Sequence, residues 1–315
     1  MFLFSGRRRP HLSHALDDAD LGRILKSLSE APRPGGIGMT DLHVARMADL
    51  LRRTGADDWD RRAHRFAVLA EATAHSGAPN GWLAREPDSA DAMLLYAWAE
   101  LVRGVRSGGM RDARVAIGYC YRAADLCPTD PNPWVVVLGI SRLERDRRSM
   151  PAIWREVLAR DPQHREAHLQ MLGHLSPEEG GSRMQVLEFV DVVRARTAAD
   201  APTAAVELTA AVDQHRSVLA RGGVEALMAR DFWSQPSMAG VLDEVAQRWP
   251  QPGFLRHARA LADLNLLAYA LVTAERRREA AQVFPLLEGR VTAWPWALRG
   301  DPVEAFLDAQ TRSVR

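Results

Sequence analysis

The stretch PTDPNPWVVVLGISRLERDRRSMPAIWREVLARDPQHREAH, residues 128–168, decides the fold because its landmark residues recur at a fixed spacing. Pro128 and Pro162 are 34 residues apart, and Trp134 and His168 are separated by the same interval. Trp154 follows Trp134 by 20 residues. A fixed period of roughly 20 to 50 residues is the sequence signature of repeat architectures, so we expect stacked helix pairs here.

A second register aligns the Asp-Pro pairs that begin at residues 130 and 161, which gives a spacing of 31. That register would place Trp134 opposite Arg165, and a charged side chain is a poor partner in the core of a helix pair. The spacing of 34 is therefore preferred. The preceding segment supports it, since small, large, small and proline residues fall at the matching positions, Ala116, Cys120, Ala123 and Pro128.

This pattern resembles the tetratricopeptide repeat, a helix pair with a period of about 34 residues. Residues 88–128 and 129–162 are similar to successive repeats, the first of them lengthened by a loop at SGGMRD. The resemblance implies an all-α fold: a right-handed α-α superhelix, or TPR-like solenoid, with divergent terminal helices. The tail at 289–310 does not fit a repeat, and we expect Trp294 and Trp296 to cap the last helix pair. As a pattern, this tail is similar to uncharacterised actinobacterial helical-repeat proteins.

Apolar residues at helical spacing run along most of the chain, and Pro- and Gly-rich breaks separate them. No convincing alternating strand pattern is present, and 30–38 reads as a loop. We expect three regions: a helical region with a degenerate pair (1–87), TPR-like repeats (88–202), and divergent pairs with a C-terminal cap (203–315). The expected helices are 41–53, 57–75, 88–105, 110–127, 133–146, 150–160, 164–175, 182–198, 203–220, 237–248, 254–275 and 277–287.

Composition is that of a protein with a real core, since 47% of the 315 residues are hydrophobic and 26% are charged. The net charge of +1 makes nucleic acid an unlikely partner, although Arg7–Arg9 form a basic cluster. The mixed-charge stretch 52–65 is expected to be a solvated face. The sequence contains neither a signal-peptide pattern nor an apolar run long enough to span a membrane, which favours a cytoplasmic protein.

Catalytic motifs are weak. His164 and His168 are four residues apart with Glu166 between them, but a zinc protease requires H-E-x-x-H, and Arg165 occupies the glutamate position. The two imidazoles could still chelate a metal, whereas the repeat register makes His168 the equivalent of the core residue Trp134. Cys120 and Cys127 are expected to be unbridged thiols, and Cys120 falls at a buried repeat position. We therefore expect neither a catalytic residue nor a cofactor.

The family resemblance implies a concave groove lined by the first helix of each pair. Carried over position by position, the partner-binding residues would be Leu95, Val102, Arg106, Asn132, Val135, Gly139, Arg142, Glu166, Leu169 and Gly173. Their apolar side chains would accept apolar groups, and Arg106 or Arg142 could pair with an acidic group. The two glycines are expected to leave room for a ligand. This lining departs from the Lys/Asn carboxylate clamp of chaperone-binding members.

Two main hypotheses follow. The first is a non-catalytic scaffold or regulatory protein that binds a protein or peptide in the groove. Such a protein could also form a homo-oligomer. The alternative is an enzyme or a small-molecule or metal binder on the same helical scaffold, with His164, His168 and Glu166 as its best residues. A third hypothesis, a nucleic-acid-associated regulator, depends on Arg7–Arg9.

Overall fold

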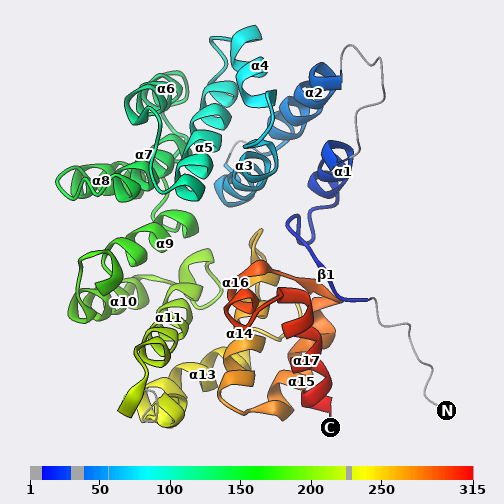
Figure 1. The fold of residues 1–315 in the computed structure, drawn as a ribbon, viewed down its shortest axis with the longest axis vertical. Helices are drawn as coiled ribbons and strands as arrows, with labels where there is room; N and C mark the ends of the chain where they lie inside the picture. Colours follow the sequence, from blue (N-terminus) through cyan, green and yellow to red (C-terminus); the bar gives the residue numbers. More distant parts are fainter. Residues whose placement is uncertain (1–8, 30–38, 56, 225–228, 315) are drawn as a thin grey trace. The chain divides into compact units, whose positions relative to one another are not determined.

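The computed structural model describes residues 9–29, 39–55, 57–224 and 229–314, and within these ranges its regular structure is almost wholly helical (Figure 1). The all-α prediction is thus confirmed. The loop expected at 30–38, together with Arg7 and Arg8, lies outside the described residues. Contacts between Cα atoms divide the chain into two compact units, which we call the N-terminal unit (Asp17–Ser182) and the C-terminal unit (residues 9–16 with 183–314). The division into three regions stays a prediction.

The N-terminal unit is a succession of helices that pack against their neighbours. Its helices are α1 (Ala19–Ser29), α2 (Met39–Arg52), α3 (Trp59–Thr73), α4 (Ala78–Arg85), α5 (Ala90–Ser107), α6 (Ala113–Leu126), α7 (Asn132–Leu143), α8 (Met150–Arg160), α9 (Arg165–His174) and the 3-10 turn η1 (Pro177–Glu179). Helices α3, α5, α7 and α9 form a series in which each member packs on the next. The alternate helices α4 and α6 each pack against both members of that series that adjoin them in sequence, and α8 packs against α7.

Small side chains explain the close approach of α5 and α6. Ala116, Cys120 and Ala123 are buried on the inner face of α6, as their positions in the sequence pattern predict. Their volumes are low, so the α6 backbone can lie near α5 without forcing large side chains apart. Ser89 begins α5 by accepting a hydrogen bond from the Ala92 amide, and Gly108 ends it in the left-handed region (φ +79°).

Trp134 and His168, the residues that the 34-residue spacing pairs, each face an aromatic ring of the preceding helix. The Trp134 ring lies 5.6 Å from the Tyr121 ring of α6, and the His168 ring lies 4.9 Å from the Trp154 ring of α8. The Arg160 guanidinium stacks over Trp134 at 5.1 Å. Both members of the pair are therefore packing residues at the start of their helices.

The C-terminal unit has its own helices and one very short parallel sheet. Strand β1 (His11–Leu12) pairs with β2 (Arg290–Val291) in the register His11 to Arg290. The helical elements are α10 (Arg183–Arg196), η2 (Pro202–Ala204), α11 (Ala205–Arg221), η3 (Ala229–Ser234), α13 (Pro236–Arg248), α14 (Ala260–Thr273), α15 (Arg277–Leu287), α16 (Ala293–Trp296), η4 (Ala297–Arg299) and α17 (Pro302–Val314).

Trp296 anchors the core of the C-terminal unit. Its ring packs against Tyr269, Phe284 and Phe306, and its indole N–H donates to the Asn265 Oδ1 at 2.9 Å. Trp296 thus packs on α14 and α15, whereas Trp294 is 37% exposed, and the capping role of the tail stays a prediction. No helix of the described chain is both long enough and apolar enough to cross a membrane.

Candidate partner-binding groove

A pocket of about 630 Å³ lies along the helix series α3, α5, α7 and α9 of the N-terminal unit. Its floor and walls include the apolar side chains of Trp98, Leu101, Val102, Val105 and Leu143. Val105, near the C-terminal end of α5, is 62% exposed. Such a volume is ordinary for a ligand site, so this pocket is the candidate functional site. We call it the groove.

Half of the residues that the sequence assigned to the groove line it. Val102 and Arg106 come from α5, Gly139 and Arg142 from α7, and Glu166 from α9. The sequence reasoning missed Trp98, Leu101 and Val105, which also line the groove. Helical spacing would have identified them, since all three lie within four residues of Val102 and share its face of α5. The groove therefore occupies the C-terminal halves of α5 and α7.

The remaining assignments fall elsewhere. Leu95, Asn132 and Val135 are buried, because the early turns of α5 and α7 are covered by neighbouring helices. The Asn132 amide donates to the Asp130 carboxylate at 2.7 Å. Leu169 is half-buried and Gly173 lies beside the groove, and neither lines it.

The two glycines make room for this chain's own side chains. A Cβ on Gly139 would lie 2.7 Å from a methyl carbon of Leu101, and one on Gly173 would lie 2.1 Å from the Arg142 guanidinium. Real Cβ atoms do not approach other atoms so closely. The expectation that these glycines leave space for a ligand is therefore replaced by an internal packing role.

Four arginine side chains line the groove, namely Arg106, Arg142, Arg145 and Arg147, and two of them have carboxylate partners. Arg142 donates from Nε to Glu179 Oε2 at 2.7 Å and from Nη1 to Gln170 Oε1 at 2.7 Å. Arg106 pairs with Glu71. Arg145 is exposed at the groove and makes no ion pair within the described part of the chain. Arg147 also lines the groove, and its Nη1 donates to the Glu179 carbonyl oxygen at 3.0 Å rather than to a carboxylate. Arg145 and Arg147 are thus the groove cations that have no carboxylate partner within the described residues.

The histidines are held inside the fold. His164 is the N-cap of α9: its Nδ1 accepts a hydrogen bond from the Ala167 amide at 3.4 Å, and its Nε2 lies 3.4 Å from Asn132 Oδ1. The Nδ1 of His168 lies 2.9 Å from the His164 carbonyl oxygen. Burial lowers the pKa of both imidazoles, that of His164 to about 4. Within the described residues, no group of three or more His, Cys, Asp or Glu side chains is arranged to hold a metal ion.

Cys120 is in an equally unreactive setting. Its thiol is fully buried and unbridged, and burial raises its pKa well above the ordinary value. Because the thiolate is the nucleophilic form, this environment opposes covalent catalysis.

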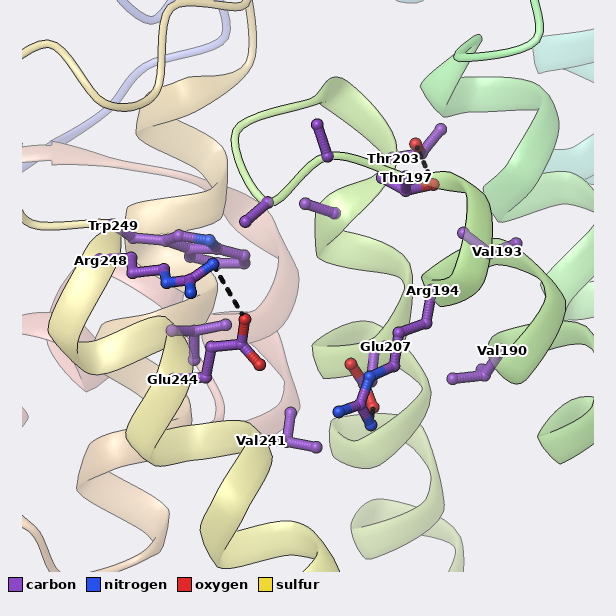
Figure 2. Close-up of a pocket in the computed structure, with 14 residues that line it drawn as sticks. Val190, Val193, Arg194, Thr197, Thr203, Glu207, Val241, Glu244, Arg248 and Trp249 are labelled. Atoms are coloured by element: carbon purple, nitrogen blue, oxygen red, sulfur yellow. Dashed lines mark hydrogen bonds and ion pairs between the residues drawn. The ribbon is translucent and has the colours of Figure 1, made fainter.

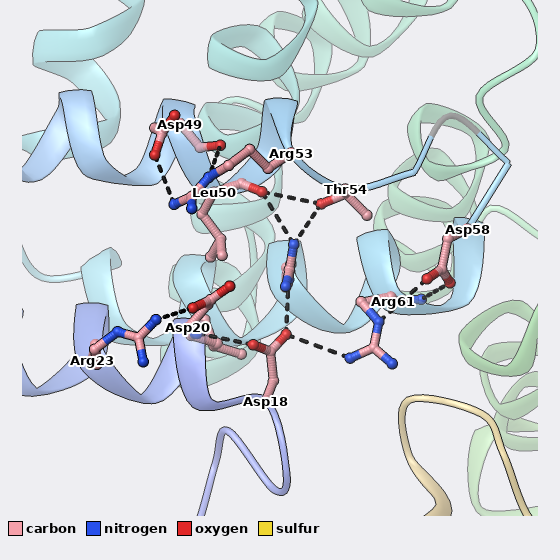
Figure 3. Close-up of polar contacts among 11 residues, drawn as sticks. Asp18, Asp20, Arg23, Asp49, Leu50, Arg53, Thr54, Asp58 and Arg61 are labelled. Carbon is pink, nitrogen blue, oxygen red and sulfur yellow. Dashed lines mark hydrogen bonds and ion pairs between the residues drawn. The ribbon is translucent and has the colours of Figure 1, made fainter.

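The stretch 52–65 is less solvated than its charge pattern predicts, because Arg62 and Arg65 are buried or nearly so. Arg65 donates from Nε to Asp18 Oδ2 at 2.8 Å, and from Nη1 to Thr54 Oγ1 and the Leu50 carbonyl (Figure 3). This network fastens α1 and α2 to α3. A charge pattern alone cannot distinguish it from a surface face, because the partners are distant in sequence.

The chain matches no known protein family, curated protein or solved structure. Functional arguments therefore depend on the geometry of the described residues.

Proposed function

We propose that the N-terminal unit is a right-handed, TPR-like helical-repeat solenoid whose groove binds a protein or peptide segment. The protein would act as a scaffold or regulatory factor in the cytoplasm, without chemistry of its own. Two observations support the proposal: the 34-residue spacing in the sequence, and the series in which α3, α5, α7 and α9 pack each on the next.

The observation that carries the proposal is the groove itself. A pocket of about 630 Å³ with a mainly apolar floor suits side chains of an extended or helical segment. Val105 is 62% exposed at its edge, so a bound partner would remove this side chain from water. Burial of apolar area at about 25 cal/mol per Å² would favour binding.

Charge indicates the kind of partner. Arg145 is unpaired at the groove within the described residues, and Arg106 shares its carboxylate partner with solvent, since Arg106 is 37% and Glu71 is 49% exposed. A segment that presents apolar side chains with an acidic group nearby complements this arrangement.

The test is a selection of dodecapeptides from a random displayed library on the full-length protein, followed by affinity measurements. Val105→Asp puts a charge into the groove, and Leu126→Asp is the matched control, since Leu126 is 54% exposed on α6 outside the groove. We expect Val105→Asp to weaken the selected peptides at least about tenfold, or about 1.4 kcal/mol, and Leu126→Asp to leave them unchanged. Equal affinities for both variants would refute the groove as the binding site.

A further inference from the structure

Helix α10 carries apolar side chains on opposite sides. Val190 and Val193 are buried, and they line a cavity that α10 forms with α11 and α13 (Figure 2). Away from this cavity, Met184, Leu187 and Val192 are 64%, 41% and 49% exposed. A helix that is hydrophobic all round is normally buried all round. Within the described part of the chain α10 is covered on one side only, so its exposed side suits contact with a further molecule.

Two carboxylates lie among these exposed apolar side chains. Glu188 and Asp191 follow Met184 by four and seven residues, and at 3.6 residues per turn they share its side of the helix. Both are exposed, and neither makes an ion pair within the described residues. Met184, Leu187, Glu188, Asp191 and Val192 together form what we call the α10 face. It is an apolar surface with an acidic centre.

The arginines of α10 lie beside this face and leave its centre negative. Arg194 is paired with Glu207 of α11, with 3.3 Å between Nη1 and Oε1 (Figure 2). Arg183 begins the helix and Arg196 ends it. By helical geometry, all three lie about a quarter of a turn or more from the line that joins the two carboxylates.

The groove of the same protein has the complementary chemistry. Its floor is apolar, with Leu101, Val102 and Val105 among the lining side chains, and Arg145 and Arg147 have no carboxylate partner within the described residues. Contact with the α10 face would remove the apolar side chains of both surfaces from water. The carboxylates of that face would at the same time meet the two guanidinium groups.

Other helices with exposed apolar side chains fit the groove less well. Helix α6 has three such side chains, but they lie among the exposed Arg114 and Arg122, which the groove cations would repel. On α17, the carboxylate next to the exposed Leu307 is already paired with Arg312. Among the helices of the described chain, α10 therefore presents the surface that matches the groove in both apolar character and charge.

We propose that the groove of one copy binds the α10 face of a second copy, so that the protein self-associates through two different surfaces of its own chain. The inference rests on the groove as the proposed binding site, and it names a second copy of this chain as the occupant. Two copies close the assembly when each gives its α10 face to the groove of the other. Otherwise the same contact adds copies one after another.

The test measures the molecular mass of the full-length protein by sedimentation velocity over a range of concentrations. We expect the wild type to self-associate. Val105→Asp in the groove and Leu187→Asp on the α10 face should each raise the dissociation constant of self-association at least about tenfold, or about 1.4 kcal/mol. Leu126→Asp is the control and should leave the constant unchanged, because Leu126 is exposed on α6 outside the groove. A wild type that stays monomeric at every concentration would overturn the proposal.

Mixing the two weakened variants tests whether the groove and the α10 face contact each other. The Leu187→Asp protein keeps an intact groove and the Val105→Asp protein keeps an intact α10 face, so one wild-type contact can form between them. We expect the mixture to associate at least about tenfold more tightly than either variant alone. If α10 packs on α10 of the second copy instead, Val105→Asp will associate like the wild type. That result, or a mixture without recovery, refutes the proposal.

The peptides selected on the groove separate this inference from the proposed function. A monomeric wild type whose peptide binding is lost in Val105→Asp would refute the second copy as the occupant and would leave the groove as a binding site. If the proposal is correct, the selected peptides should instead compete with self-association and dissociate the wild-type assembly. Peptides that bind the groove without changing the mass of a self-associated wild type would count against it.

Discussion

Acidification should destabilise the N-terminal unit through His164. This imidazole is 2% exposed, and its neutral form is the one that the fold requires, because Nδ1 must accept the Ala167 amide hydrogen bond. A proton on Nδ1 would remove this cap and place a positive charge at the positive end of the α9 dipole. Burial accordingly lowers the pKa of His164 to about 4, although the nearby Asp130 carboxylate opposes the effect.

The sign and the size follow from proton linkage. The folded pKa lies below the ordinary value of 6.5, so the unfolded chain takes up the proton first as the pH falls. The stabilisation from His164 is complete above about pH 6.5 and is lost as the pH falls to about 4. Since a pKa difference of one corresponds to about 1.4 kcal/mol, the loss is about 3 kcal/mol over this range.

The assay compares the wild type with His164→Asn by urea unfolding between pH 7 and pH 4.5. Asparagine is a good N-cap and does not titrate, so the variant keeps the cap acceptor and removes the proton site. We expect the difference in unfolding free energy between the two proteins to change in favour of the variant as the pH falls. Burial also lowers the pKa of His168, but this residue is present in both proteins. Its contribution to the pH dependence therefore largely cancels in the difference between the two unfolding free energies.

Urea unfolding reports on both compact units of the chain. Hydrogen exchange of the α9 amides therefore supplies a second measurement, of the opening free energy of the helix that His164 caps. Parallel stability curves for the two proteins, or a directly measured pKa near 6.5 for His164, would refute the reasoning. In either case the imidazole would be hydrated or free to move away from its cap position.

Three further predictions concern stability. Gly139→Ala should cost about 1–2 kcal/mol in urea unfolding, because overpacking against Leu101 exceeds the gain in helix propensity; no loss would mean that Leu101 moves freely aside. Arg65→Met should cost about 3 kcal/mol, because the buried Asp18 carboxylate would keep only the Leu21 amide and a 3.8 Å contact with Arg61, and a double-mutant cycle with Asp18→Asn should recover part of that loss. Asn265→Leu should cost at least about 2 kcal/mol, since two buried groups lose their hydrogen bond; calorimetry that finds an unchanged midpoint would contradict this.

The helices could be predicted because each carries an apolar face at a regular spacing. The prediction for 150–160 coincides with α8, and that for 277–287 coincides with α15. Helix α4 was missed because Gly77, Pro79 and Gly81 punctuate it, and such residues normally indicate a loop. The pairing of β1 with β2 could not be predicted, because two-residue strands separated by most of the chain leave no periodic signal.

Only part of the groove could be predicted, because a periodic pattern identifies the face of a helix but not which turns of that face are open. Positions spaced along one helix face share a direction, but the neighbouring helices of the series cover the early turns and not the late ones. Leu95 and Val135 therefore join the core, while Val102 and Arg142 reach the groove from the same faces. Periodicity fixes the face of a helix, and only the packing of its neighbours fixes which turns of that face remain open.

The charge of the groove depends on the SPEEGG segment, residues 176–181, which follows α9. Glu179, in the SPEEGG segment, neutralises Arg142, and Gly173 lets that guanidinium lie against the α9 backbone. Arg142, which the repeat position assigned to the groove, is thus already neutralised by Glu179. Arg145, which follows α7 in the left-handed region (φ +57°), and Arg147 are the lining cations that have no carboxylate partner within the described residues. The acid preference proposed for the partner therefore derives from loop residues and from the exposed Arg106, and not from Arg142.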